Sequence, residues 1–202
     1  MKAQDNASDS ELLQSIQAGD ENAFALLYRR RQGGIFRFAL QMCGSPTLAE
    51  DVTQEVFLVL LRESHAFDPA RGSLSAFLFG IARNQLLRRL QRERFYVPMD
   101  PDNDEKDDLQ RKSTGPLEEI SRTETIETVR RAILSLPERY REVVVLCDLE
   151  ELSYVETAEI LGCAIGTVRS RLHRARGLLI EKLRPADKSV AASDVKSARC
   201  FA

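Results

Sequence analysis

The sequence of 202 residues has no tryptophan and only two histidines, His65 and His173, which lie far apart. Its cysteines also stand far apart, at Cys43, Cys147, Cys163 and Cys200. Without a C-x-x-C pair they indicate neither a zinc knuckle nor a disulfide framework. There is no H-E-x-x-H motif, no phosphate-binding glycine loop, and no serine or cysteine with an evident partner base. We therefore expect no cofactor, no metal and no catalytic activity.

Long hydrophobic runs are also missing. The longest unbroken aliphatic or aromatic run covers residues 56–61, whereas a membrane-spanning helix needs about 20 such residues. The start, MKAQDNASDS, has no apolar core for a signal peptide. We expect a protein of the reducing cytoplasm with no membrane partner. Strand signals are almost absent too, because the one β-branched run, residues 143–146, lies within a stretch of helical spacing. The sequence predicts an all-α fold.

Composition shifts along the chain divide it into parts. Residues 95–120 contain three prolines, a glycine and an acidic block without an amphipathic period, which predicts a flexible acidic linker. Two small helical domains remain, at residues 10–94 and 121–184. Residues 1–9 and 185–202 are expected to be disordered ends.

Charge is strongly uneven although the net charge is only -2. Residues 71–94 hold six arginines against one glutamate, and residues 169–184 hold five arginines and one lysine against one glutamate, so each segment carries +5. Residues 100–108 hold five aspartates and one glutamate against one lysine, hence -5. Two basic segments separated by an acidic one are typical of a protein that binds a polyanion such as nucleic acid.

Residues 152–183 have the pattern of a helix-turn-helix. Ser153 is a suitable N-cap with Glu156 as its capping-box partner. Ala158 stands where two helices approach closely, Gly162 where the turn needs a left-handed residue, and Val168 where the second helix packs on the first. We expect this second helix to begin near residues 166–167 and to bind duplex DNA, with an ordinary helical hairpin as the alternative.

The second helix would project polar and basic side chains toward the major groove and its phosphates. The candidate residues are Thr167, Arg169, Ser170, Arg171, His173, Arg174 and Arg176. A solvated basic face is the alternative for the arginines, and His173 could equally be a bystander.

Two helices of the N-terminal domain carry unusual faces. The helix over about residues 47–62 sets Leu58 and Leu61 among charges on its expected solvent face, which indicates a protein-binding surface or packing within the domain. The helix from Ser73 to about Arg94 places an aromatic ring, two amides and a guanidinium on one narrow arc, at Phe77, Asn84, Arg88 and Gln91. This set suits single-stranded nucleic acid, unless Phe77 folds inward.

Five stretches of the sequence match a known family: DENAFALLYRR, AEDVTQEVFLVLLR, FDPARGSLSAFLFGIARN, LPERYREVVVLCDLEELSYVETAEILG and GTVRSRLHRAR. In that order and spacing the chain resembles a bacterial RNA polymerase sigma factor of the extracytoplasmic-function (ECF) group of the sigma-70 family. The resemblance spans almost all of residues 11–184. It implies a domain two that binds core RNA polymerase and the melted minus-ten strand, and a helix-turn-helix domain four that binds the duplex minus-thirty-five element.

The resemblance also implies residue roles. The surface that docks on the clamp helices of the largest polymerase subunit would be Asp51, Gln54, Glu55, Phe57, Leu58 and Leu61. The minus-ten contacts would be Phe77, Arg83, Asn84, Arg88, Arg89 and Gln91. The helix from Thr167 would bind the minus-thirty-five element, and the acidic linker would run toward the RNA exit channel. An anti-sigma factor is a further partner to consider.

The sequence departs from many relatives at three positions. Phe77 stands in place of Trp, Glu151 in place of Gly, and Ala164 in place of Pro. The competing interpretation is a stand-alone helix-turn-helix regulator with an N-terminal sensor or dimerisation domain. That protein would bind duplex DNA without polymerase.

Overall fold

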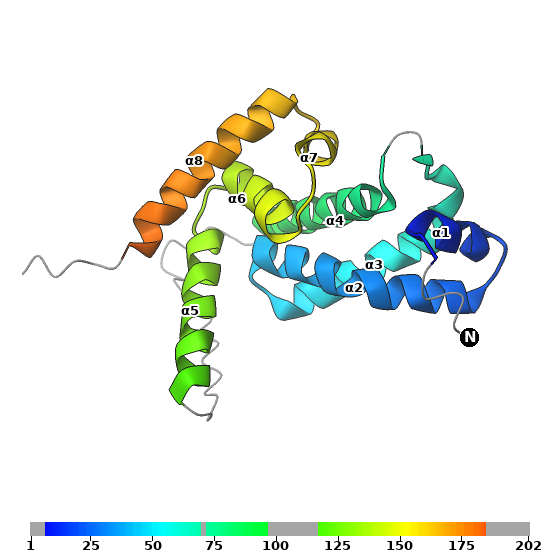
Figure 1. Cartoon of the computed structure of the whole chain (residues 1–202), viewed down its shortest axis with the longest axis horizontal. Helices are drawn as coiled ribbons and strands as arrows, with labels where there is room; N and C mark the ends of the chain where they lie inside the picture. Colours follow the sequence, from blue (N-terminus) through cyan, green and yellow to red (C-terminus); the bar gives the residue numbers. More distant parts are fainter. Residues whose placement is uncertain (1–6, 70–71, 97–116, 185–202) are drawn as a thin grey trace, which may run out of the picture.

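The computed structural model describes residues 7–69, 72–96 and 117–184, and there its regular secondary structure is entirely helical. The N-terminal domain consists of α1 (Asp9–Gln17), α2 (Glu21–Cys43), α3 (Pro46–Glu63), a 3-10 turn η1 (Ser64–Ala66) and α4 (Leu74–Tyr96). The C-terminal domain consists of α5 (Leu117–Leu134), α6 (Glu138–Val144), a π-helical turn η3 (Val145–Leu149), α7 (Tyr154–Leu161) and α8 (Ile165–Leu183). The predicted all-α fold is confirmed (Figure 1).

Short polar side chains set the helix starts of the N-terminal domain. Ser8 and Glu11 form a capping box on α1, and the Ser45 hydroxyl caps α3, which has a proline at its first position. The structure differs here from the expected disordered residues 1–9, because α1 already begins at Asp9. Arg30 Nη1 donates to the Ala7 carbonyl at 2.9 Å and to Asp9 Oδ1 at 2.8 Å, which fixes this end on α2.

The core of the N-terminal domain lies between α1, α2, α3 and α4. Its fully buried side chains include Leu27, Phe38, Val52, Leu60 and Leu86. They recur at three- and four-residue steps on each helix, which is the pattern of a single buried stripe.

A second apolar cluster holds the C-terminal domain together, with Leu136, Val143, Val168 and Leu172 all buried. Its helix-turn-helix turns at Gly162, whose φ of 61° is in the left-handed region. Glycine adopts this conformation without the steric cost that a Cβ brings.

The helices extend further into the predicted linker than expected. α4 ends at Tyr96 instead of about residue 94, and α5 begins at Leu117 within the predicted linker of 95–120. The remaining predictions for residues 1–6, 97–116 and 185–202 concern residues outside those that the structure describes.

The two domains pack against each other, with α7 beside α4 and α6 against α2 (Figure 1). Val145, Leu146 and Leu152 of the C-terminal domain are buried in the apolar cluster of the N-terminal domain. Nearby, Arg141 Nη1 donates to the carbonyl of Met42 at the end of α2, at 2.7 Å. Across the described ranges, no helix combines the length and apolar character that a membrane crossing requires.

Candidate nucleic-acid and polymerase interface

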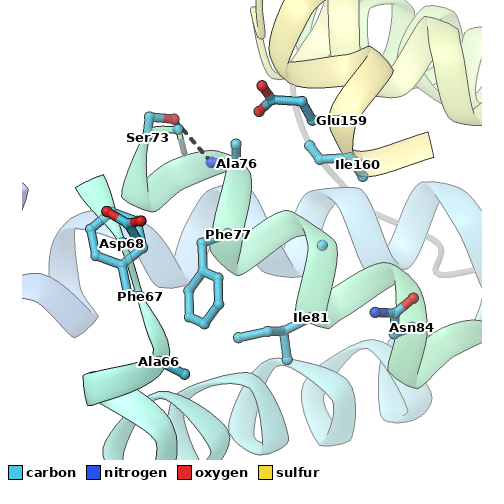
Figure 2. Close-up of a pocket in the computed structure, with 12 residues that line it drawn as sticks. Ala66, Phe67, Asp68, Ser73, Ala76, Phe77, Ile81, Asn84, Glu159 and Ile160 are labelled. Carbon is cyan, nitrogen blue, oxygen red and sulfur yellow. Dashed lines mark hydrogen bonds between the residues drawn. The ribbon is translucent and has the colours of Figure 1, made fainter. Parts of the chain in front are cut away.

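Helix α4 carries the first candidate site beside a hollow of about 460 Å³. The Ser73 hydroxyl accepts the amide hydrogen bond of Ala76 at 3.1 Å, so α4 starts close to the predicted point. Phe77 and Asn84 both line the hollow, seven residues apart on one side of the helix (Figure 2). The structure thus brings together an aromatic ring and a base-edge amide, as the sequence predicted.

Phe77 is partly folded inward and partly accessible, which combines the two alternatives given by the sequence. Its ring is half-buried and packs against Phe67, with ring centroids 5.5 Å apart, yet it still forms part of the hollow. Asn84, Arg88 and Gln91 are exposed along the same helix. A base that stacks on Phe77 would lie within the same hollow as the Asn84 side chain.

The other two basic residues assigned to minus-ten binding have carboxylate partners. Arg83 Nε donates to Glu142 Oε1 of α6 at 2.6 Å. Arg89 Nη1 donates to Asp51 Oδ2 of α3 at 3.1 Å. Asp51 belongs to the predicted polymerase surface, so the two predicted surfaces of this domain adjoin at the Arg89–Asp51 pair.

The predicted polymerase surface on α3 is exposed for most of its members. Leu58 is 52% exposed and Leu61 46%, and Gln54 is exposed beside them. Glu55 Oε1 accepts from Arg62 at 2.8 Å. These side chains form an apolar strip bordered by charges, as expected for a docking surface.

Phe57 does not share that exposure. It is 2% exposed and its ring packs beneath α3, 4.6 Å from the Tyr28 ring centroid and 6.2 Å from that of Phe24. The assignment of Phe57 to direct polymerase contact is corrected to a core position. The sequence signal for this was available, because Phe57 falls three residues before the buried Leu60 and four after the buried Thr53.

The helix-turn-helix has the predicted caps. Ser153 accepts from the Glu156 amide at 3.2 Å and its own amide donates to Glu156 Oε2 at 3.0 Å. Burial opposes ionisation of Glu156, but hydrogen bonds from Ser73 and Ser153 outweigh it and lower its pKa. α8 begins at Ile165, slightly before the expected 166–167, and Ala164 at its N-cap provides no side-chain hydrogen bond.

The predicted recognition residues of α8 share one outer side. The exposed members are Arg169, Ser170, His173, Arg174 and Arg176, and the half-buried ones are Thr167 and Arg171. The Arg176 guanidinium already holds Asp148 through two hydrogen bonds of 2.6 and 3.0 Å. Arg169 lies 5.8 Å over the ring centroid of Tyr154. The basic surface is therefore partly fixed in place by neighbouring side chains.

Two features were missed by the sequence reasoning. Glu142 and Glu150 are acidic side chains of the C-terminal domain that are nearly buried against arginines of the N-terminal domain, with side-chain exposures of 5% and 6%. Their partners lie 59 and 113 residues away in the chain, beyond the reach of any local pattern. A glutamate within an apolar helical run, as Glu142 is before Val143, was the available signal.

Burial raises the pKa of the Cys147 thiol, which favours its protonated form. Among the described residues, no group of His, Cys, Asp or Glu is suited to hold a metal ion. Cys200 lies outside the described residues.

Two known protein families match this chain, one in each domain. The sigma-70 region 2 family matches residues 27–96, over α2, α3 and α4, and the sigma-70 region 4 family matches residues 126–179, over the helix-turn-helix. The chain belongs to the ECF group of sigma-70 factors. Its N-terminal and C-terminal domains are thus sigma domain 2 and sigma domain 4.

Relatives along almost the whole chain agree. The ECF RNA polymerase sigma-E factor of Escherichia coli K12 is 36% identical over 189 residues, covering 88% of this chain and 95% of that protein. The ECF RNA polymerase sigma factor SigW of Bacillus subtilis is 30% identical over 178 residues, covering 85% and 95%.

Two solved structures share the fold. CnrH, in complex with the cytosolic domain of CnrY, has a TM-score of 0.64 at 26% identity and covers 86% of this chain and 95% of its own. The sigma factor RpoE of Bartonella quintana, in complex with the anti-sigma factor NepR, has a TM-score of 0.62 at 28% identity and covers 77% and 92%.

Proposed function

We infer that this protein directs RNA polymerase to promoters as a dissociable specificity subunit with no catalysis of its own. The observation that carries the inference is the presence, in one chain and in the order of sigma regions 2 and 4, of two separate surfaces whose side chains suit nucleic acid. One is the hollow of α4 with Phe77 and Asn84, and the other is the basic side of α8. Because core polymerase acts inside the cell, we place the protein in the cytoplasm.

Domain 2 captures the melted minus-ten strand in this proposal. An unpaired base stacks on Phe77 while the Asn84 amide bonds its edge, and Arg88, Arg89 and Gln91 hold the strand along α4. Unstacking a base costs a few kcal/mol, which these contacts offset. The half-buried Phe77 ring offers one face to a base, so the replacement of Trp by Phe reduces stacking area without removing the contact.

Domain 4 binds the duplex minus-thirty-five element through α8. Its N-terminal part enters the major groove with Thr167 and Ser170 toward the base edges, where each good base contact contributes about 1–3 kcal/mol of discrimination, and the flanking Arg169 and Arg171 hold phosphates. Arg174 and Arg176 lie further along and hold phosphates. His173 is exposed next to them and can donate or accept a hydrogen bond.

The exposed strip of α3 docks on the clamp helices of the largest polymerase subunit. Leu58 and Leu61 provide its apolar centre, and Asp51, Gln54 and Glu55 its polar border. We also propose an anti-sigma factor as a partner, because the RpoE structure similar to this chain is a complex with one.

The test is in vitro transcription with purified core polymerase across a library of genomic DNA, with the start sites mapped. The proposal expects a set of start sites that depends on this protein and shares two upstream elements. A stand-alone regulator would instead bind duplex sites without core enzyme and would leave the start sites of core polymerase unspecified. That result would contradict the proposal.

A further inference from the structure

An acidic side chain lies among the arginines that the proposed function assigns to duplex DNA. Asp148, on the turn η3, accepts hydrogen bonds from Arg176 of α8, from Nη2 at 2.6 Å and from Nε at 3.0 Å. Both side chains remain accessible, with exposures of 54% for Arg176 and 29% for Asp148. A carboxylate on this surface repels phosphates, so a DNA-binding helix gains nothing from it unless the carboxylate acts on the arginine.

The geometry of the pair leaves Arg176 able to bind a second anion. A guanidinium donates from Nε, Nη1 and Nη2 in one fixed plane. Asp148 occupies the edge formed by Nε and Nη2, so the Nη1 side points away from the carboxylate. A phosphate can bind on the Nη1 side while Asp148 stays in place. The carboxylate then supports the guanidinium instead of competing for it.

Tyr154, the first residue of α7, contacts a second arginine of the same surface. The guanidinium carbon of Arg169 lies 5.8 Å from the centroid of the Tyr154 ring, over its face. At this distance the ring attracts a cation. Tyr154 is 38% exposed, so its ring is not a core side chain of domain 4. It restricts the position of Arg169 and leaves the guanidinium N–H groups to other acceptors.

An arginine loses rotamer freedom when it binds a phosphate, and contacts made beforehand reduce that cost. We propose that Asp148 is a positioning residue for the minus-thirty-five element, which holds the Arg176 guanidinium where it binds a DNA phosphate. Tyr154 does the same for Arg169. The proposal rests on the proposed function, because it takes α8 to be the helix that binds this element.

The experiment measures binding of reconstituted holoenzyme to a fluorescein-labelled promoter duplex, chosen by start-site mapping. Asp148→Asn makes the protein more positive, so general electrostatics would strengthen binding. The proposal expects the opposite sign, a loss of about threefold, because asparagine cannot hold both nitrogens of Arg176 and the side chain must be immobilised on binding.

Glu181→Gln is the matched control for Asp148→Asn. It also removes a negative charge, from an exposed position of α8 itself. The control should bind the duplex at least as tightly as the wild-type protein. The proposal is wrong if Asp148→Asn binds as tightly as this control.

Uncharged phosphates separate positioning from a structural role. In a series of duplexes, one phosphate of the minus-thirty-five element at a time is replaced by a methylphosphonate. At the phosphate that binds Arg176, the replacement should cost wild-type holoenzyme about tenfold in affinity and should cost Arg176→Gln almost nothing. Asp148→Asn should reduce the cost to about threefold at that position alone. A reduced cost at every position would show a displaced α8, which contradicts the proposal.

Tyr154 is tested by its own pair of variants. Tyr154→Leu removes the ring beneath Arg169 and should weaken duplex binding about threefold. Tyr154→Phe keeps the ring and should restore most of that affinity. Equal losses in the two variants would assign the tyrosine hydroxyl to the DNA and would overturn the role given to the ring.

The proposed function has a separate readout in the arginines themselves. If Arg176→Gln and Arg169→Gln weaken binding while Asp148→Asn does not, only the positioning is wrong. If neither arginine variant weakens binding, these residues do not hold phosphates, and the positioning proposal is wrong with them. An exposed ion pair contributes little to stability, so Asp148→Asn should melt close to the wild-type temperature. A much lower melting temperature would make Asp148 a residue of the fold and would also overturn the proposal.

Discussion

Arg83 of α4 and Glu142 of α6 form an ion pair across the boundary between the two domains, with Nε 2.6 Å from Oε1. Both side chains are largely withdrawn from water, at 22% and 5% exposure. Such a pair costs desolvation energy when it forms, and removing one partner leaves the other charge without compensation. The pair therefore couples the packing of domain 4 to Arg83, a residue assigned to DNA binding.

This coupling predicts the stability of variants at the pair. Glu142→Gln should lower the free energy of unfolding by about 1.5 kcal/mol, since a hydrogen bond between charged groups becomes a weaker one. With Arg83→Gln as the second change, a double-mutant cycle should give a coupling of about 1–3 kcal/mol. Urea unfolding followed by circular dichroism measures all four proteins. Strictly additive losses would show that the two side chains do not interact.

Glu151 has a φ of 56°, a left-handed conformation that disfavours any residue with a Cβ. Glu151→Gly should raise the free energy of unfolding by about 0.5–1 kcal/mol, because the relief of steric strain exceeds the added chain entropy of glycine. Thermal unfolding measures the change. Glu151→Ala is the control, since it removes the charge but keeps the Cβ. An equal gain in both variants would attribute the effect to charge beside Glu150 instead.

Caps and turns that depend on a few neighbouring residues were predictable from the sequence. The Ser153 and Glu156 capping box and the Gly162 turn were predictable, because each depends on residues a few positions apart. The unusual Glu at position 151 was also visible, and its positive φ gives the physical reason why glycine suits that place. Local chemistry decides such features before any tertiary contact forms.

Contacts across the domain boundary were not predictable. The family resemblance assigns Arg83 to DNA binding, and nothing near it in the sequence indicates Glu142. Phe57 was misplaced for another reason, because a match to a family motif was given more weight than the buried spacing of its own helix. A pattern shows which residues matter to a fold but does not show which of them reach the surface.

Asn84 should contribute to the choice of minus-ten sequence. Asn84→Ala removes one base-edge contact, so transcription from duplex promoters with the preferred base should fall about tenfold relative to those with another base. Multi-round transcription with reconstituted holoenzyme on a panel of minus-ten variants measures this ratio. Gln85→Ala is the control, because it removes a similar amide from the next position of α4. A uniform loss across the panel would indicate a structural role.

Arg171 should contribute a phosphate contact rather than base discrimination. Arg171→Gln should make the slope of log affinity against log salt less steep by about 0.9, since one fewer counterion is released from the DNA. Holoenzyme binding to a promoter duplex over a series of KCl concentrations gives the slope. Ser170→Ala keeps the charge and should leave the slope unchanged while altering affinity at one base position. A slope unaffected by Arg171→Gln would exclude this arginine from the phosphate contacts.

On α3, the exposed residues proposed to bind polymerase are distinct from the buried residues that stabilise the fold. Leu58→Ala/Leu61→Ala removes the exposed apolar strip, so affinity for core polymerase should fall at least tenfold while the free energy of unfolding stays nearly constant. Phe57→Ala instead empties a buried site between Tyr28 and Phe24 and should cost about 3–5 kcal/mol of stability. Fluorescence titration with core enzyme and thermal unfolding measure the two effects. If the double leucine variant unfolds as readily as Phe57→Ala, the strip belongs to the core of domain 2 and the docking surface lies elsewhere.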